Sequence, residues 1–223
     1  MVDTMDGRRD DNCIGDGPLR HVYVHIPFCA RICPYCAFYK ERADPALTGR
    51  FCEALVAELR DYTSTEASRN GAVDASLCEA RGGGRDLIGV GTVETASGLL
   101  RPTTIFFGGG TPTTLTTPQL AFIFDGFAEC LDLSDLAEWT FEANPGSVSE
   151  SKARLLRERG VTRISLGVQS FDDPLLELLG REHSAAQAVA SFELLRRAGF
   201  ENLSIDLMFG LPGQTLAQWQ ETL

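Results

Sequence analysis

Short apolar segments alternate with helical patterns along most of this 223-residue chain. The apolar segments have the length of buried strands and lie at residues 22–26, 104–107, 139–141, 163–168 and 203–209. Segments with apolar residues at helical spacing lie between and after them, and each begins at a residue type that caps helices. These helix starts are Asp44-Pro45, Thr117-Pro118, Ser147 or Ser149, Asp173-Pro174, Ser184 and Thr215. The pattern predicts an α/β protein.

Repeated strand–helix units predict a parallel sheet covered by helices, because crossover connections are right-handed. In such sheets and barrels, functional groups gather at the carboxyl ends of the strands. Here the strand ends carry polar or flexible groups, namely the cysteine loop, Gly108-Gly109-Gly110, Glu142, Gln169 and Asp206. We therefore expect one shared site at this edge. The helix that begins at Thr215 stops at Leu223, so we expect the last layer of the fold to be missing.

Two stretches lack these patterns. Residues 1–20 are polar and are predicted to form a flexible tail. Residues 63–101 contain seven glycines and many Ser, Thr and Ala residues without periodicity. We interpret this stretch as a mobile surface insertion. The predicted organisation is therefore a single domain over residues 21–223 that the insertion interrupts.

Composition and charge exclude several classes of protein. Apolar residues make up 43% of the chain and charged residues 23%, which is typical of a folded domain. The net charge of −11 disfavours a general nucleic-acid binder. No apolar run approaches the roughly 20 residues needed to cross a bilayer, and the first twenty residues do not resemble a signal peptide. We expect a cytoplasmic protein without membrane insertion.

Three of the seven cysteines, Cys29, Cys33 and Cys36, form a C-x3-C-x2-C group. An odd number of cysteines without a signal peptide argues against a disulfide framework. Structural zinc usually takes four ligands, so zinc would need one more, such as His25, Cys13 or Cys52. Three thiolates on a [4Fe–4S] cluster would leave one iron open for a small chelating ligand. The spacing favours the cluster, with zinc as the alternative.

The other cysteines are predicted to have no ligand role. Cys52 and Cys130 lie on the apolar faces of predicted helices and are expected in the core. Cys13 and Cys78 lie in the predicted flexible parts and are expected to be unligated. His25 lies in an apolar strand, so we expect a core histidine with its hydrogen bonds satisfied.

The cysteine group and its neighbouring sequence resemble the radical S-adenosylmethionine (SAM) family. The matching segments are Tyr23 to Cys36, Gly108-Gly109-Gly110-Thr111-Pro112, Leu166 to Phe171 and Gly210-Leu211-Pro212-Gly213. They are similar to the branch that contains oxygen-independent coproporphyrinogen III oxidase and HemW-type heme chaperones. The resemblance covers residues 21–223 apart from 63–101. It implies a partial (βα)6 TIM-like barrel whose mouth holds a [4Fe–4S] cluster, with SAM on the open iron and reductive cleavage of SAM to a 5′-deoxyadenosyl radical.

The resemblance also implies which residues hold these cofactors. The three grouped cysteines would bind the cluster. Tyr23 would flank SAM, the backbone at Gly109 would approach its methionine end, and Glu142 would bind the first SAM molecule. Six residues match positions that contact a second SAM in the oxidase: Tyr35, Gly110, Thr111, Gln169, Arg181 and Asp206. Asp206 is also expected to need a partner, since an acid within an apolar strand is costly to bury.

One departure distinguishes the two activities of this branch. The oxidase has a fourth cysteine two residues after the third, where this chain has Phe38. The resemblance therefore favours a HemW-like protein that binds heme and delivers it to acceptor proteins, over decarboxylation of coproporphyrinogen III. The heme ligands of such a protein would lie in a C-terminal domain outside this sequence.

The partners that the resemblance implies are heme or a porphyrinogen, heme-acceptor proteins and an electron donor such as flavodoxin or ferredoxin. A third interpretation, of another class, is a zinc-stabilised interaction module or an inactive fragment. Loss of iron–sulfur absorbance in cysteine variants would separate the cluster from zinc.

Overall fold

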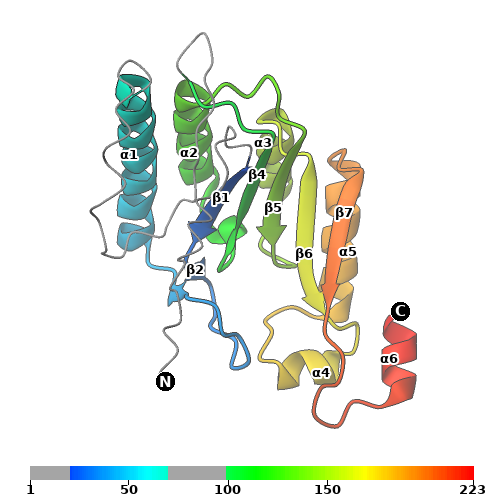
Figure 1. Ribbon diagram of the computed structural model, residues 1–223. Helices are drawn as coiled ribbons and strands as arrows, with labels where there is room; N and C mark the ends of the chain where they lie inside the picture. The colour runs from blue at the N-terminus through cyan, green and yellow to red at the C-terminus, as the bar shows by residue number, and fades with distance from the viewer. Residues whose placement is uncertain (1–20, 70–98) are drawn as a thin grey trace, which may run out of the picture.

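The computed structural model describes residues 21–69 and 99–223 (Figure 1). The predicted tail at 1–20 and residues 70–98 of the predicted insertion lie outside the described residues, and so do Cys13 and Cys78. Five parallel strands form the main sheet: β1 (His21–Ile26), β4 (Thr104–Gly109), β5 (Glu138–Ala143), β6 (Arg163–Gln169) and β7 (Asn202–Leu207). Each apolar segment predicted as a strand is one of them.

The strands lie side by side in the order β1-β4-β5-β6-β7, which is also their order along the chain. With right-handed crossovers, this order places successive helices on the same face of the sheet, as in a barrel. The helices are α1 (Pro45–Arg69), α2 (Thr117–Cys130), α3 (Glu150–Glu158), α4 (Asp173–Leu178), α5 (Ala185–Arg197) and α6 (Leu216–Thr222). Of these, α2 packs against α1 and α3, and α3 packs against α5 (Figure 1). The fold is a partial TIM-like barrel.

Helix starts follow the predicted capping chemistry, but the caps of α2 and α4 are Thr116 and Asp172, each one residue before the predicted Thr117 and Asp173. The hydroxyls of Thr116, Ser184 and Thr215 accept hydrogen bonds from the third residue of α2, α5 and α6, and each is part of a capping box. Of the two candidates for α3, Ser149 is the cap. Ser147 instead stabilises the turn after β5, where its hydroxyl donates to the carbonyl of Asn144 at 2.6 Å.

The first helix is longer than predicted. It continues to Arg69, beyond the expected start of the insertion at residue 63. Thr63 is buried and its hydroxyl donates to the carbonyl of Leu59 at 3.0 Å, so this threonine packs within the helix rather than ending it. At the other end of the predicted insertion, Leu100 is buried and forms a β-bridge with Leu131. Residues 63–69 and 99–101 therefore belong to the folded domain, which corrects the prediction there.

The side chains of the strands alternate between two faces of the sheet. The face toward the helices is apolar and holds an aromatic cluster, in which Phe107 stacks on Phe141 at 5.1 Å and Phe124 meets Trp139 edge-on at 5.1 Å. Cys52 and Cys130 are buried in this core, as predicted. The opposite, concave face carries the polar residues of each strand.

His25 lies on the concave face rather than in the core where it was expected, and Asp206, which was expected to need a partner, lies on the same face. His25 is half-buried, with its Nε2 3.1 Å from the carbonyl of Tyr39 and its Nδ1 3.1 Å from the hydroxyl of Tyr23. Its hydrogen bonds are satisfied as predicted, but it is not a core residue. Asp206 is exposed and accepts from the Ser165 hydroxyl at 3.0 Å. The argument from burial was therefore wrong for Asp206, because alternate positions of β7 face the open side of the sheet.

Candidate functional site

The loop that carries the three grouped cysteines is closed by a small parallel strand pair that was not predicted. Its strands are β2 (Phe28–Cys29) and β3 (Glu41–Arg42). The amide of Glu41 donates to the carbonyl of Pro27 at 2.6 Å, and that of Ala43 to the carbonyl of Cys29 at 2.9 Å. Both ends of the loop are thereby fixed next to β1.

Lys40 stabilises the closing half of this loop. Its Nζ donates to the carbonyls of Cys36 at 2.6 Å and Phe38 at 3.0 Å. The amide of Cys36 donates to the carbonyl of Cys33 at 3.2 Å, which forms a turn between these two cysteines. A positive charge thus lies beside the backbone that presents the thiols, an arrangement that suits anionic thiolates.

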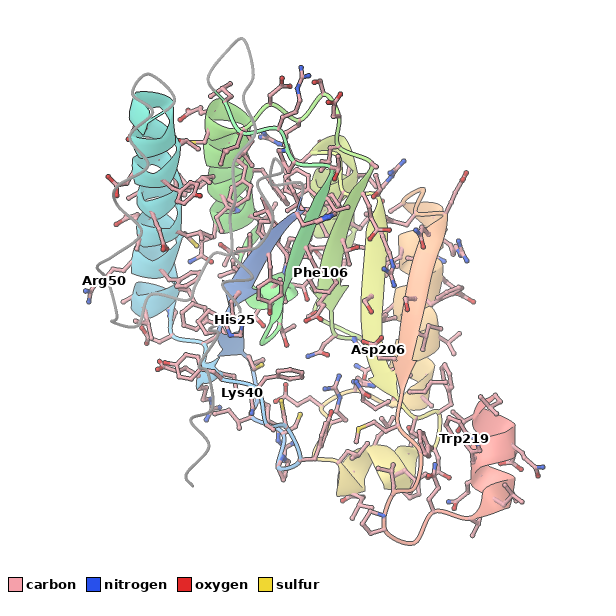
Figure 2. The ribbon with its side chains drawn as sticks, in the orientation of Figure 1. His25, Lys40, Arg50, Phe106, Asp206 and Trp219 are labelled. Carbon is pink, nitrogen blue, oxygen red and sulfur yellow. The ribbon has the colours of Figure 1, made fainter. Side chains whose placement is uncertain are left out.

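A cavity of about 240 Å³ lies between the cysteine loop and the carboxyl ends of β4 to β7. It is lined by all the predicted site residues except Tyr23, namely Cys29, Cys33, Cys36, Tyr35, Gly109, Gly110, Thr111, Glu142, Gln169, Arg181 and Asp206. Figure 2 shows Lys40 and Asp206 at this same end of the sheet. The single site expected at the carboxyl edge is therefore present.

Tyr23 is the predicted residue that does not line this cavity. It lies on the concave face of β1, where its ring stacks on Phe106 at 5.9 Å. Seven lining residues were not predicted as site residues: Arg31, Phe38, Lys40, Ala143, Asn144, Ser165 and Gly167. Asn144 follows β5 directly before Pro145-Gly146, and a polar side chain at a strand end followed by a turn is the signal that could have identified it.

Glu142 is a half-buried residue of the cavity lining and accepts a hydrogen bond from the amide of Gly109 at 3.2 Å. Burial raises the pKa of this carboxyl, the amide of Gly109 opposes the shift, and the charge of Asp206 adds to it. Two carboxylates line one cavity here, and among the described residues Glu142 has no cationic hydrogen-bond partner. The position is suited to a cationic group of a ligand.

The glycine run after β4 permits a very close approach of two backbones. The amide of Gly110 donates to the carbonyl of Ile26 at 2.8 Å, and that of Thr111 to the carbonyl of Phe28 at 2.7 Å. A Cβ atom on Gly110 would lie 2.7 Å from the Phe28 oxygen, so no side chain fits there. Gly109 has a φ of +105°, and a Cβ atom added to it would lie 2.6 Å from the Nδ1 atom of His25. These glycines join β4 to the cysteine loop.

Gln169 has a strained backbone at the end of β6. Its φ of +71° is the only positive value among the non-glycine residues that the structure describes. The register between β6 and β7 shifts at this point, and the Gln169 carbonyl accepts from the amide of Met208 at 2.9 Å. Strain of this kind concentrates at functional sites, and here it accompanies a side chain that lines the cavity.

Arg181 brings a positive charge into the cavity from the segment after α4. Its Nη2 donates to Oδ1 of Asn144 at 2.6 Å and to the carbonyl of Gly167 at 2.5 Å. Its Nη1 lies 3.7 Å from the sulfur of Cys33 and 3.5 Å from the hydroxyl of Tyr35. This guanidinium therefore joins β5 and β6 to the cysteine loop.

The three thiols of the loop line one cavity. All five cysteines within the described residues are free. In the same residues, no three His, Cys, Asp or Glu side chains are grouped closely enough to hold a single metal ion. Zinc requires all its sulfur ligands about 2.3 Å from one point, whereas an iron–sulfur cluster binds each thiolate to a different iron. The donor set of three thiols therefore fits a cluster, whereas structural zinc would need a fourth protein ligand.

A family model for the radical SAM superfamily matches residues 93–223. The chain belongs to the radical SAM superfamily, and membership implies a [4Fe–4S] cluster and SAM. It is 39% identical over 206 residues to the heme chaperone HemW of Bacillus subtilis, covering 92% of this chain and 46% of that protein. It is 32% identical over 204 residues to the mitochondrial radical S-adenosyl methionine domain-containing protein 1 of Bos taurus, covering 91% of this chain and 39% of that protein.

The fold is also similar to a solved structure, coproporphyrinogen III oxidase (HemN) of Escherichia coli, described as a radical SAM enzyme. The TM-score is 0.68 at 25% identity, over 92% of this chain and 40% of the oxidase. This chain thus spans less than half the length of each of these three proteins. In the part of the chain that the structure describes, no helix combines the length and apolar character needed to cross a membrane.

Proposed function

We propose that this chain is the cluster- and SAM-binding portion of a HemW-type heme chaperone. The single observation that carries the proposal is the cavity at the carboxyl edge of the sheet. It brings the three grouped cysteines together with all but one of the nine residues that the resemblance assigns to SAM. These residues come from six separate segments of the sequence, and their convergence on one cavity supports a shared site.

In this proposal Cys29, Cys33 and Cys36 ligate the cluster, whose role when bound is to supply one electron to the sulfonium of SAM. The chain itself binds and orients the ligand. Glu142 accepts hydrogen bonds from the ammonium group of the ligand. The positive charge of that group also offsets the repulsion between the carboxylates of Glu142 and Asp206. Arg181 supplies a positive charge opposite a carboxylate.

The remaining predicted residues complete this assignment. Tyr35, Gly110, Thr111, Gln169 and Asp206 line the rest of the cavity and are proposed to contact SAM. The concave face around Tyr23 would extend the site beyond the cavity, toward the nucleoside end of the ligand.

Anaerobic reconstitution with iron and sulfide tests the cluster. The wild-type chain is expected to bind about four irons and to show broad charge-transfer absorbance in the visible. Cys29→Ala, Cys33→Ala and Cys36→Ala are each expected to lose most of this absorbance. Cys52→Ala, a buried cysteine of α1, is the matched control and should retain it. Zinc or no metal in reconstituted wild-type protein would contradict the proposal.

Phe38 favours the chaperone over the oxidase. This residue lines the cavity and is 71% exposed at the position where the oxidase pattern has a fourth cysteine. The product of the complete gene is expected to give a saturable change in Soret absorbance with hemin, and no decarboxylated product from coproporphyrinogen III with SAM and a reductant. Decarboxylated product would establish the second candidate, an oxygen-independent coproporphyrinogen III oxidase, which the fold similarity to HemN supports.

The proposal includes partners outside the chain. Heme-acceptor proteins would receive the heme, and a one-electron donor such as flavodoxin or ferredoxin would reduce the cluster. A cytoplasmic location remains a prediction, and the Bos taurus relative is described as mitochondrial.

A further inference from the structure

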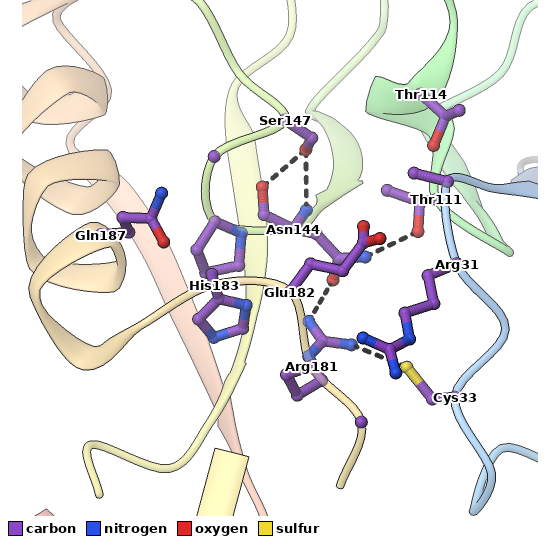
Figure 3. A pocket seen from close by; sticks show the side chains of 14 residues that line it. Arg31, Cys33, Thr111, Thr114, Asn144, Ser147, Arg181, Glu182, His183 and Gln187 are labelled. Atoms are coloured by element: carbon purple, nitrogen blue, oxygen red, sulfur yellow. Dashed lines mark hydrogen bonds between the residues drawn. The ribbon is translucent and has the colours of Figure 1, made fainter. Parts of the chain in front are cut away.

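We infer that Asn144 is a positioning residue that directs hydrogen bonds toward two of the cluster sulfurs and thereby raises the reduction potential of the cluster. This inference rests on the proposed function, since it requires that the cysteines hold a cluster. Figure 3 shows Asn144 between Thr111 on one side and Arg181 on the other. Neither the sequence pattern nor the resemblance assigned a role to this side chain.

The amide of Asn144 connects the two groups that contact the thiols. Its Nδ2 donates to Oγ1 of Thr111 at 2.8 Å, and that oxygen lies 3.5 Å from the sulfur of Cys29. Its Oδ1 accepts from Nη2 of Arg181 at 2.6 Å, and Nη1 of the same guanidinium lies 3.7 Å from the sulfur of Cys33. One side chain therefore connects the surroundings of both cysteines.

The chemistry of the partners determines which way the amide points. A guanidinium only donates, so the atom of Asn144 that faces Arg181 must be the oxygen. The NH₂ group then faces Thr111 and occupies a lone pair of its hydroxyl oxygen. The hydroxyl hydrogen is left free to point elsewhere. A metal-bound thiolate can only accept, so that hydrogen can be donated to the sulfur of Cys29.

The backbone of Asn144 is fixed, so the side chain cannot easily turn away. Its carbonyl accepts from the hydroxyl of Ser147 at 2.6 Å and from the amide of Ser147 at 3.0 Å. The carbonyl of Ser147 in turn accepts from Nζ of Lys152 at 3.0 Å, and the same ammonium donates to the carbonyl of Thr113 in the turn after Thr111. The two segments that carry Asn144 and Thr111 are thus held together.

Hydrogen bonds to sulfur and nearby positive charge stabilise the reduced, more negative state of an iron–sulfur cluster. Asn144→Asp reverses this arrangement without changing the size of the side chain. A carboxylate cannot donate, so the Thr111 hydroxyl would turn toward it and leave the sulfur of Cys29 without its donor. The same carboxylate would offset the charge of Arg181. Both effects are expected to make the cluster harder to reduce.

The test is an anaerobic redox titration of the reconstituted chain with dithionite, followed by the electron paramagnetic resonance signal of the reduced cluster. We expect the midpoint potential of Asn144→Asp to be more negative than that of wild type. A tenfold lower ratio of reduced to oxidised cluster at one potential corresponds to about 59 mV for a one-electron couple. Thr111→Val should shift the potential in the same direction, and the double variant should shift it by less than the sum of the two.

Asn202→Asp is the matched control, because it adds the same charge at an exposed position at the amino end of β7. Its potential should equal that of wild type. An unshifted potential in Asn144→Asp with full iron content would overturn the inference while leaving the cluster intact. A wild-type chain without a cluster would instead overturn the proposed function.

Asn144→Ala provides a second measurement if the aspartate variant does not take up iron. It removes the donor and the acceptor without adding charge, so a smaller shift toward negative potential is expected. If neither variant holds a cluster although both unfold at the wild-type temperature, Asn144 is needed for cluster assembly and does not tune its potential, and the inference is wrong.

Discussion

Several side chains of the cavity are held by partners on more than one strand, which gives the site a defined geometry before any ligand binds. Arg181 contacts the strand ends of β5 and β6 and the cysteine loop. Glu142 is held by the amide of Gly109 but has no cationic hydrogen-bond partner within residues 21–69 and 99–223. Its ionised form is therefore disfavoured in the ligand-free protein, a cost that a bound cation would remove.

The substitution Glu142→Gln is expected to stabilise the ligand-free chain at neutral pH and to weaken SAM binding. Because burial raises the pKa of Glu142 above that of the unfolded chain, protonation favours the folded state, and wild-type stability falls as pH rises through the folded pKa. The advantage in Tm of the glutamine variant should thus grow as the pH rises above the pKa of glutamate in the unfolded chain, about 4.3. Thermal unfolding at increasing pH measures it, with Glu53→Gln on the exposed face of α1 as control. A Tm difference independent of pH would contradict the assignment.

At the scale of elements, the cysteine loop and the glycine run form one unit. The β2–β3 pair closes the cysteine loop, and the backbone at Gly110 lies directly against β1 and β2. This contact explains why a glycine run follows β4 even before a ligand is considered. A strand and a loop that are far apart in the sequence can approach to backbone distance only where one of them has no side chain.

Gly110→Ala is expected to destabilise the chain, because its Cβ would lie within 3 Å of three backbone atoms of β1 and β2. Overpacking of this kind costs about 1–3 kcal/mol, or about 2–4 °C in Tm per kcal/mol for a chain of this size. Gly49→Ala is the matched control. It lies in α1 with no atom within 4 Å of the added methyl group, so helix propensity should raise Tm slightly. Equal Tm values for wild type and Gly110→Ala would show that the backbones can separate freely.

At the scale of the whole molecule, the sheet has one covered face and one open face. The helices cover the apolar face, and the polar face carries the candidate site at its carboxyl edge. The chain has a net charge of −11, but Arg31, Lys40 and Arg181 all line the cavity. These three positive charges outnumber the two carboxylates of the cavity, Glu142 and Asp206, and they favour an anionic thiolate-bound cluster there despite the acidity of the whole chain.

Cluster binding should connect the cysteine loop to the rest of the molecule and protect it from proteolysis. Arg31 is exposed in this loop and offers a site for trypsin. We expect reconstitution to slow cleavage after Arg31 by about tenfold or more, which corresponds to about 1.4 kcal/mol of loop stabilisation. Cys33→Ala treated in the same way should show no protection. Equal cleavage rates in the wild-type chain before and after reconstitution would show that the cluster does not order this loop.

Much of the fold and site could be read from local sequence. The apolar segments, the cap at Ser184 and the C-x3-C-x2-C group all depend on residues within a few positions of one another, and the structure confirms the strands and this cap. The parallel order of the strands follows from their alternation with helices. It places the cysteine loop, Glu142 and Gln169 at the same edge, because carboxyl ends of parallel strands meet there.

Other features depend on contacts between distant segments and could not be read from any local pattern. The continuation of α1 past Thr63 and the exposure of Asp206 depend on which face of the fold each residue meets. Asn144 acquires its place only when Thr111 and Arg181 converge on it from two other loops. Helix propensity and cysteine spacing depend on neighbouring residues, so they can be read along the chain. Hydrogen-bonding groups on different loops come within bonding distance only after the strands have assembled, so their pairing cannot be read in this way.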